Sequence, residues 1–215
     1  MSTLFRIDSS PQGGESSISR QLTTEFVQQW RQAHPDGKVI TRDLTGTGLP
    51  VVTADWIGAA FTPEADRTPH QRKVLAISEE LVRELQTADE YVIGVPMYNF
   101  SIPAVLKLWI DQIVRAGKTF SYEGGAPAGL LLQKKATFLV ASGGVYDPGT
   151  PMAAMNFAEP YLRSIFAFVG VKDVRFVHAG GTAKLKYGAD RNTILQPALA
   201  SIRALLSAAA NASLT

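Results

Sequence analysis

The chain has 215 residues, of which 46% are hydrophobic and 19% charged, with a formal net charge of +2. This composition supplies a large core, excludes a disordered chain and gives no sign of a nucleic-acid partner. Without cysteine, disulfides, thiolate metal sites and cysteine nucleophiles are excluded. The first residues form a strand pattern rather than a signal peptide, and no apolar run has the length of a membrane helix. We therefore expect a cytoplasmic protein with one domain over residues 1–215.

Short apolar runs predict five strands. Continuous runs of this length are typical of parallel strands that are covered on both faces. Helical periodicity fills the intervals, most clearly where apolar residues recur at every fourth position from Ile18 to Trp30. The predicted strands are Leu4–Asp8, Lys38–Arg42, Glu90–Val95, Ala136–Ala141 and Asp173–His178. After the first helix, which begins at Ser17, further helices are predicted over Pro69–Thr87, Pro103–Arg115, Met155–Val169 and Asn192–Ala210.

The alternation of strands and helices predicts an α/β fold with a doubly wound parallel sheet. Five strands favour the order 2-1-3-4-5, in which open sheets bind ligands at the switch point between the first and third strands. Two segments, residues 46–69 and 117–135, fit neither pattern. Long excursions of this kind are often functional in compact domains.

The turn after the first strand is rich in serine. Ser10, Ser16 and Ser17 offer hydroxyl groups, and the helix that follows offers free N–H groups. Together they predict a neutral cradle for a phosphate dianion. The turn contains no lysine, and the motifs GxxxxGK[ST] and GxGxxG are absent, which argues against a nucleoside triphosphate and a dinucleotide. The alternative is that Ser16 or Ser17 only caps the helix.

Two more turns follow the third and fourth strands. The third strand ends at Pro96 and Pro103 opens the next helix, so we expect the N–H groups of residues 97–100 and the Asn99 side chain to point out of the sheet edge. A flat ring with amide-like edges suits these donors. Gly143 and Gly144 would let such a ring, or a chain attached to it, lie against bare backbone. The alternatives are an ordinary strand-to-helix connection and a tight turn that needs positive φ.

These features resemble the FMN-dependent azoreductases, which are relatives of the quinone reductases in the flavodoxin-like superfamily. The resemblance runs from the first strand to His178 and implies a flavodoxin-like fold with one non-covalent FMN per chain. It also implies a homodimer with its active site at the interface, and NADH or NADPH as the electron donor. The residues that carry it are Asp8 to Pro11 with Ser16 and Ser17, Pro96 to Pro103, Leu108 to Asp111, Gly117 to Phe120, and Ala141 to Gly144.

The resemblance further implies roles for individual residues. The phosphate would be held by Ser10, Ser16, Ser17 and Ile18. The isoalloxazine ring and ribityl chain would contact Pro96, Met97, Tyr98, Asn99 and Phe100, and the polar edge of the ring would face Ser142, Gly143 and Gly144. The substrate pocket would hold Phe120, Tyr122 and Tyr146. Many relatives have an arginine after a serine where this chain has Ala141 and Ser142, and a histidine where this chain has Tyr146. The Tyr146 hydroxyl is a candidate proton donor.

The implied activity is a two-electron, ping-pong reduction. NAD(P)H would reduce the flavin and leave, and a quinone or an azo compound would then enter the same pocket, with azo compounds reduced to aromatic amines over two cycles. FMN carries this chemistry, so no catalytic side chain is required and no metal site is expected. The alternatives are a flavodoxin-type electron carrier without small-substrate turnover and a cofactor-free interaction domain. Such carriers are usually acidic, whereas this chain is net positive.

The helix predicted over Pro103–Arg115 supports the homodimer. Its apolar residues cover more of the circumference than one sheet face can bury, so a second subunit would cover the rest. The alternative is that residues 46–69 fold back over this helix within one chain. Lys107, Asp111 and Arg115, four residues apart, are expected to form a solvated ladder, and Trp109 to pack in a helix or subunit contact.

Overall fold

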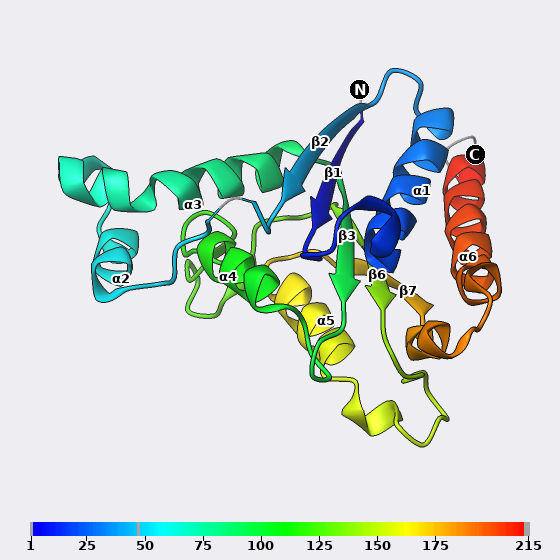
Figure 1. Ribbon diagram of the computed structural model, residues 1–215. Coiled ribbons are helices and arrows are strands. Elements are labelled where there is room, and N and C mark those ends of the chain that lie inside the picture. The colour runs from blue at the N-terminus through cyan, green and yellow to red at the C-terminus, as the bar shows by residue number, and fades with distance from the viewer. Residues whose placement is uncertain (1, 47, 213–215) are drawn as a thin grey trace.

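The computed structural model describes residues 2–46 and 48–212, and a five-stranded parallel sheet lies at its centre (Figure 1). The sheet order is β2-β1-β3-β6-β7, which is 2-1-3-4-5 when the five core strands are counted in chain order. The predicted flavodoxin-like fold class is therefore confirmed, and each observed strand is one residue longer than its prediction. These strands are β1 (Thr3–Asp8), β2 (Lys38–Asp43), β3 (Glu90–Pro96), β6 (Lys135–Ala141) and β7 (Asp173–Ala179).

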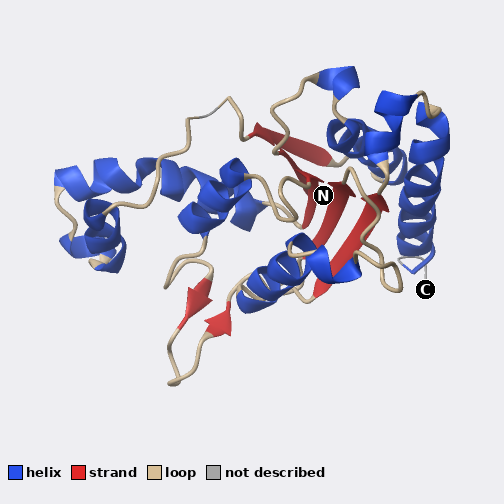
Figure 2. Cartoon of the chain, turned by 60° about the horizontal axis from the view of Figure 1, so that its bottom comes forward, coloured by secondary structure: helices blue, strands red, loops and turns tan. Residues whose placement is uncertain are grey.

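Helices cover both faces of this sheet (Figures 1 and 2). Two helices, α1 (Ile18–Ala33) and α6 (Arg191–Ala212), share one hydrophobic cluster with one face. The other face packs against α3 (Pro69–Thr87), α4 (Ala104–Ile113) and α5 (Ala158–Phe168). No helix within these described ranges combines the length and the apolar character that crossing a membrane requires.

The apolar stripe of α1 fixes the start of that helix beside the tip of β1. Leu22 and Trp30 are fully buried and belong to one cluster with Leu4 of β1 and Val92 of β3. Burying a large apolar side chain stabilises a fold by roughly 1.5–3 kcal/mol. This packing therefore sets where the N–H groups at the start of α1 lie relative to the sheet edge.

Four of the five predicted helix starts differ from the observed ones, three of them by a single residue. The helix predicted from Met155 begins at Ala158 with Phe157 as its N-cap, and the side-chain oxygen of Asn156, one residue earlier, accepts the Glu159 N–H at 3.1 Å. Residues Ala153–Met155 form a separate 3-10 turn, η3. In α4, Pro103 is the N-cap rather than the first helical residue.

The two unassigned excursions have structure of their own. Residues 46–69 contain α2 (Ala54–Phe61) and the 3-10 turn η2 (Glu64–Asp66), and residues 117–135 contain the projecting antiparallel pair β4 (Phe120–Ser121) and β5 (Ala128–Gly129) (Figure 2). The first excursion contacts α4. Trp56 Nε1 donates to Gln112 Oε1 at 2.8 Å, so part of α4 is covered within one chain.

The solvated ladder on α4 is wrong in one of its members. Lys107 and Asp111 do pair, with Nζ 2.6 Å from Oδ1. Arg115 is instead buried and bonds Glu79 Oε1 at 2.9 Å, because α3 lies against this end of α4. Trp109 packs in the core, as expected, where it is fully buried and its ring stacks on Phe166.

Candidate functional site

The carboxyl ends of β1, β3 and β6 border a cavity of about 410 Å³. It lies where the 2-1-3-4-5 order predicts a ligand site, between the loops that follow the first, third and fourth core strands. Eight of the residues predicted from the sequence line it, and they come from three separate turns. They are Ser10, Ser16, Ser17, Ile18, Pro96, Met97, Tyr98 and Gly143.

Ser17 caps α1 and also lines the cavity. Its Oγ accepts the Arg20 N–H at 3.4 Å and lies 3.2 Å from Ser19 Oγ. The first turn of α1 contains no acidic residue, so the positive end of the helix dipole is not neutralised by its own side chains. Helix capping and ligand binding are therefore compatible roles for this serine.

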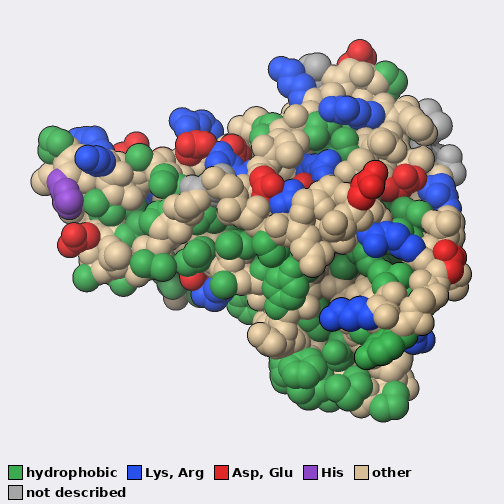
Figure 3. Space-filling model, viewed as in Figure 1, with side chains coloured by type: hydrophobic (Ala, Val, Ile, Leu, Met, Phe, Trp, Pro, Cys, Tyr) green, Lys and Arg blue, Asp and Glu red, His purple; other side chains and the backbone are tan. Residues whose placement is uncertain are grey.

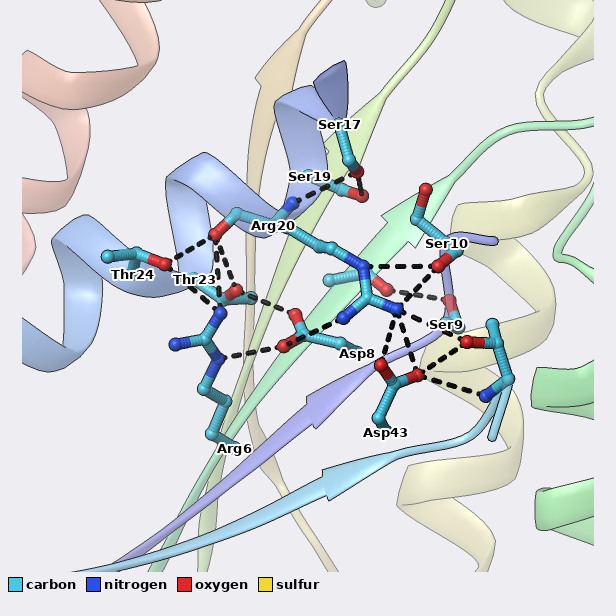
Figure 4. Close-up of polar contacts among 12 residues, drawn as sticks. Arg6, Asp8, Ser9, Ser10, Ser17, Ser19, Arg20, Thr23, Thr24 and Asp43 are labelled. Carbon is cyan, nitrogen blue, oxygen red and sulfur yellow. Dashed lines mark hydrogen bonds and ion pairs between the residues drawn. The ribbon is translucent and has the colours of Figure 1, made fainter. Parts of the chain in front are cut away.

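The loop after β1 is held from behind by Arg20 (Figure 4). The guanidinium donates to the Ser10 carbonyl oxygen from Nε at 3.1 Å and from Nη2 at 2.6 Å. Nη2 also donates to Asp43 Oδ1 at 2.8 Å. The hydrogen bond from Arg20 lowers the pKa of Asp43 to about 2. The loop, α1 and β2 are thus joined through one cation.

Asp8 anchors the same network at the tip of β1. Its side chain is buried, accepts from Thr23 Oγ1 at 2.7 Å and pairs with Arg6 Nε at 2.9 Å. Buried carboxylates need such partners, since an unpaired buried charge is strongly destabilising. Asp8 therefore supports the loop and does not line the cavity.

The turn after β3 has a strained backbone. Tyr98 and Ser101 exchange two backbone hydrogen bonds of 3.0 Å, and the two residues between them, Asn99 and Phe100, have φ of +48° and +69°. A positive φ is uncommon outside glycine and costs free energy, most of all for a bulky side chain. Strain of this kind is concentrated at functional sites, which fits the position of the turn at the cavity edge.

The expectation that all N–H groups of residues 97–100 point outward is wrong for two of them. The Met97 N–H donates to the Ala141 carbonyl at 2.8 Å, because the pairing of β3 with β6 continues one step past Pro96. The Tyr98 N–H is used by Ser101. Within the described chain, the N–H groups of Asn99 and Phe100 have no protein acceptor, so these two donors stay available.

Other predicted residues lie beside the cavity, outside its lining. The rings of Phe100 and Tyr146 meet edge to face at 6.1 Å, and Ser142 Oγ donates to the Gly144 carbonyl at 2.9 Å. Neither Gly143 nor Gly144 has positive φ, so the tight-turn alternative for these glycines fails. The residues in this position are Asn99, Phe100, Ser142, Gly144 and Tyr146.

Phe120 and Tyr122 do not reach the cavity of their own chain. They belong to the projecting β4–β5 segment, where their rings pack edge to face at 5.3 Å. Phe120 is buried, and the centroid of its ring lies 4.7 Å from that of Phe168. Within one chain, these two aromatic residues therefore form no part of the pocket at this cavity.

The sequence analysis missed the wall that follows β7. The 3-10 helix η4 (Thr182–Tyr187) is bonded to the turn after β6, since the Thr182 N–H donates to the Ser142 carbonyl at 3.0 Å and the Ala183 N–H to the Gly143 carbonyl at 3.1 Å. It brings Lys186 to the cavity, and Arg191 follows at the start of α6. The prediction of a neutral cradle considered only the turn after β1, and it did not include these two cations on the opposite wall. The available signal was topological, because the fifth strand ends at the same sheet edge.

Comparison with known proteins agrees with this architecture. A family model described as a flavodoxin-like fold matches residues 2–206, which defines the chain as a flavodoxin-like α/β protein. The chain is 56% identical to an FMN-dependent NADH:quinone oxidoreductase of Acidobacterium capsulatum, over 94% of this chain and 98% of that protein. It is 48% identical to FMN-dependent NADH:quinone oxidoreductase 3 of Burkholderia lata, over 96% of this chain and all of that one. The chain belongs to the family of FMN-dependent NADH:quinone oxidoreductases.

Solved structures give the same result. An azoreductase of Bacillus anthracis strain Sterne has a TM-score of 0.86 at 31% identity, covering 96% of this chain and 99% of that chain. An FMN-dependent NADH-azoreductase of Bacillus anthracis strain Ames Ancestor was solved in complex with FMN. It has a TM-score of 0.85 at 26% identity, and the match covers 98% of this chain and 100% of that chain. The family resemblance predicted from the sequence is thus confirmed.

Proposed function

We propose that this chain is an FMN-dependent oxidoreductase that uses NADH or NADPH to reduce quinones and azo compounds, the latter to aromatic amines. The observation that carries the proposal is the cavity at the switch point of the sheet, in a chain that is 56% identical to an FMN-dependent NADH:quinone oxidoreductase. A pocket of this size with a few polar groups at fixed places is typical of a cofactor site.

The chemistry of the cavity fits FMN from one end to the other. The start of α1 and the side chains of Ser10, Ser16 and Ser17 supply donors for a phosphate, and the nearby cations match its charge. The opposite side, formed by Met97 and Tyr98, is uncharged and suits a flat ring. We propose that the residues predicted from the sequence hold the cofactor along the cavity. Ile18 would contact the phosphate with the three serines, and residues 96–100 and 142–144 would contact the ribityl chain and the ring.

When bound, FMN would supply the ping-pong redox chemistry, taking a hydride from the nicotinamide and passing the electron pair to a quinone or azo acceptor. The chain's own residues would bind and orient. The strained Asn99–Phe100 turn would present two backbone donors and one amide side chain, and Gly143 would let the ligand approach the backbone. Tyr146 stays the candidate proton donor, and its ring lies against Phe100 at the cavity rim.

The test is stopped-flow reduction of the reconstituted protein. Bound flavin should be bleached by NADH or NADPH, and mixing the reduced protein with a quinone or an azo compound should restore its absorbance. Acid release should yield about one FMN per chain. Recovery of FAD alone, or of no flavin after reconstitution, would contradict the proposal. A protein reduced by NADH that re-oxidises only with a protein acceptor would be an electron carrier.

We also propose a homodimer with the active site at its interface. Large apolar side chains are exposed on α2 and on the segment between β6 and α5, and green side chains gather on the face shown in Figure 3. Phe61, Tyr122 and Phe157 are 75%, 60% and 55% exposed, and contiguous exposed apolar surface is a mark of protein contacts. A partner would cover this surface and bring Phe120 and Tyr122 to the neighbouring cavity.

Sedimentation velocity at micromolar protein tests the dimer. The expected result is one species at twice the chain mass. A monomer that binds FMN and still reduces quinone would show that no partner is needed. We further propose a single domain over residues 1–215, supported by one sheet that takes strands from both halves of the chain, and a cytoplasmic location, supported by a reaction that draws on NADH.

A further inference from the structure

We propose that Lys186 and Arg191 make this cavity selective for the phosphorylated flavin over riboflavin. Lys186 acts by its charge, and Arg191 acts as a positioning residue that holds the serine-rich loop in place. The inference rests on the proposed FMN site. It gives a binding role to two residues that follow β7, outside the serine-rich turn that was predicted to bind the phosphate.

The first observation is that these charges are not neutralised. Both residues line the cavity together with Ser16 and Ser17, and no aspartate or glutamate is part of that lining. Among the described residues, neither Lys186 nor Arg191 forms an ion pair with a carboxylate. Arg20 differs, because Asp8 and Asp43 balance its charge. The phosphate end of the cavity therefore carries a net positive field, which favours a dianion.

The second observation is how Arg191 meets the loop. Its Nη2 donates to the Glu15 carbonyl at 2.7 Å and its Nε reaches Gln21 Oε1 at 3.4 Å, while Gln21 Nε2 donates to the same carbonyl at 2.5 Å. The carbonyl lies in the 3-10 turn η1 (Gly14–Ser16), directly before the cap of α1. Arg20 holds this loop at Ser10, and Arg191 holds it at the other end.

The third observation is that backbone contacts hold the short helix η4, which carries Lys186, against the turn after β6. This helix is bounded by Gly181 and Gly188, whose φ values of +77° and +83° are left-handed. Glycine adopts this conformation without strain, so both ends of the short helix are sharp turns. With its first residues bonded to the turn after β6, the helix keeps Lys186 beside the cavity.

The experiment measures dissociation constants for FMN and riboflavin from the quenching of flavin fluorescence. The variants are Lys186→Gln and Arg191→Gln. Lys184→Gln is the matched control, since Lys184 is on the same short helix but lines a neighbouring cavity with Asp147 and Asp190. Lys186→Arg keeps the charge. Each measurement is made at low and high salt, because screening weakens an attraction between exposed charges.

We expect Lys186→Gln and Arg191→Gln each to weaken FMN binding about three- to tenfold, as expected for the loss of one charge-assisted contact. Riboflavin binding should be unchanged, Lys184→Gln should match the parent, and Lys186→Arg should restore FMN affinity. The salt dependence of FMN binding should be smaller in Lys186→Gln.

Two results would overturn the inference. One is an equal loss of affinity for FMN and riboflavin, which would mean a structural role. The other is an unchanged FMN affinity in both variants. A parent protein that binds no FMN would overturn the proposed function as well, whereas a parent that binds FMN with unaffected variants would overturn this inference alone.

Discussion

Arg20 donates two hydrogen bonds to a single acceptor, the carbonyl oxygen of Ser10, from Nε at 3.1 Å and from Nη2 at 2.6 Å. The guanidinium also reaches Asp43, so one side chain of α1 links the loop after β1 to the end of β2. Since the loop residues Ser10 and Ser17 line the cavity, the shape of the candidate phosphate site depends on a contact outside it.

Replacing Arg20 with methionine should loosen this loop. The variant keeps most of the apolar stem but loses the charge-assisted hydrogen bonds to Ser10 and Asp43, so we expect the free energy of unfolding to fall by about 1–3 kcal/mol. Urea unfolding of the flavin-free protein measures it as a lower midpoint with an unchanged slope. Arg31→Met, at an exposed position near the end of α1, is the control. Equal midpoints for the two variants would contradict the prediction.

The pKa of Asp43 gives the same contact a pH dependence. Arg20 lowers this pKa from 3.8 to about 2, so the folded protein holds the carboxylate ionised at a pH where the unfolded chain is protonated. The contact therefore stabilises the fold fully above about pH 4 and loses its effect as the pH falls toward 2. Because the Asp43 side chain is 45% exposed, solvent screening keeps the effect small.

Asp43→Asn is the matching variant. It should be less stable than the parent at neutral pH, and its urea midpoint should fall less steeply as the pH is lowered through the acid range. Asp36→Asn, at an exposed turn position, should keep the slope of the parent. If Asp43→Asn and the parent lose stability in parallel on acidification, the lowered pKa of Asp43 is wrong.

The strands and the meeting of three loops could be predicted because they depend on local patterns. Continuous apolar runs indicate buried parallel strands, and the strand order then places the turns after β1, β3 and β6 at one edge. That logic brought Ser17, Met97 and Gly143 to a common cavity without any contact being known. The same logic extends to the loop after β7, where the sequence analysis did not apply it.

The features that the sequence did not predict, or predicted wrongly, depend on contacts between distant segments of the chain. The bond from Arg191 to the Glu15 carbonyl joins residues 176 positions apart, and no local pattern indicates it. Arg115 has the spacing of an exposed helix ladder, yet Glu79 of α3 lies against it and makes it a buried ion pair. The Met97 N–H is used by Ala141, a pairing that depends on the register of two strands.

Two substitutions at Asn99 separate its backbone from its side chain. Its φ is +48°, a conformation that glycine tolerates and alanine does not, so Asn99→Ala should be about 1 kcal/mol less stable than Asn99→Gly. Both variants lose the amide group, and both should bind FMN more weakly by about fivefold, the equivalent of one hydrogen bond. Unfolding and flavin titration measure the two effects independently. Equal stability of the two variants would contradict the prediction about the backbone. Unchanged FMN affinity would contradict the prediction about the side chain.

Gly144 has little room for a side chain because of Tyr146. A Cβ at position 144 would lie 2.9 Å from the Tyr146 hydroxyl oxygen and 3.0 Å from its Cζ, whereas a Cβ at Gly143 would meet Ala183 at an ordinary 3.7 Å. Gly144→Val must therefore displace the Tyr146 ring, which packs edge to face on Phe100 beside the cavity. We expect the displaced ring to disturb the Phe100 turn, so FMN binding should weaken by about tenfold, which at roughly 1.4 kcal/mol exceeds the effect of Asn99→Ala.

A double-mutant cycle tests whether this effect acts through Tyr146. In a Tyr146→Ala background the clash is gone, so adding Gly144→Val should change FMN affinity by less than about twofold, a clear departure from additivity. The measurement is the FMN dissociation constant of the parent, both single variants and the double variant, with Gly143→Ala as a control for space at the neighbouring glycine. If Gly144→Val weakens binding equally in both backgrounds, the added side chain meets the flavin directly and the role of Tyr146 at this rim is wrong.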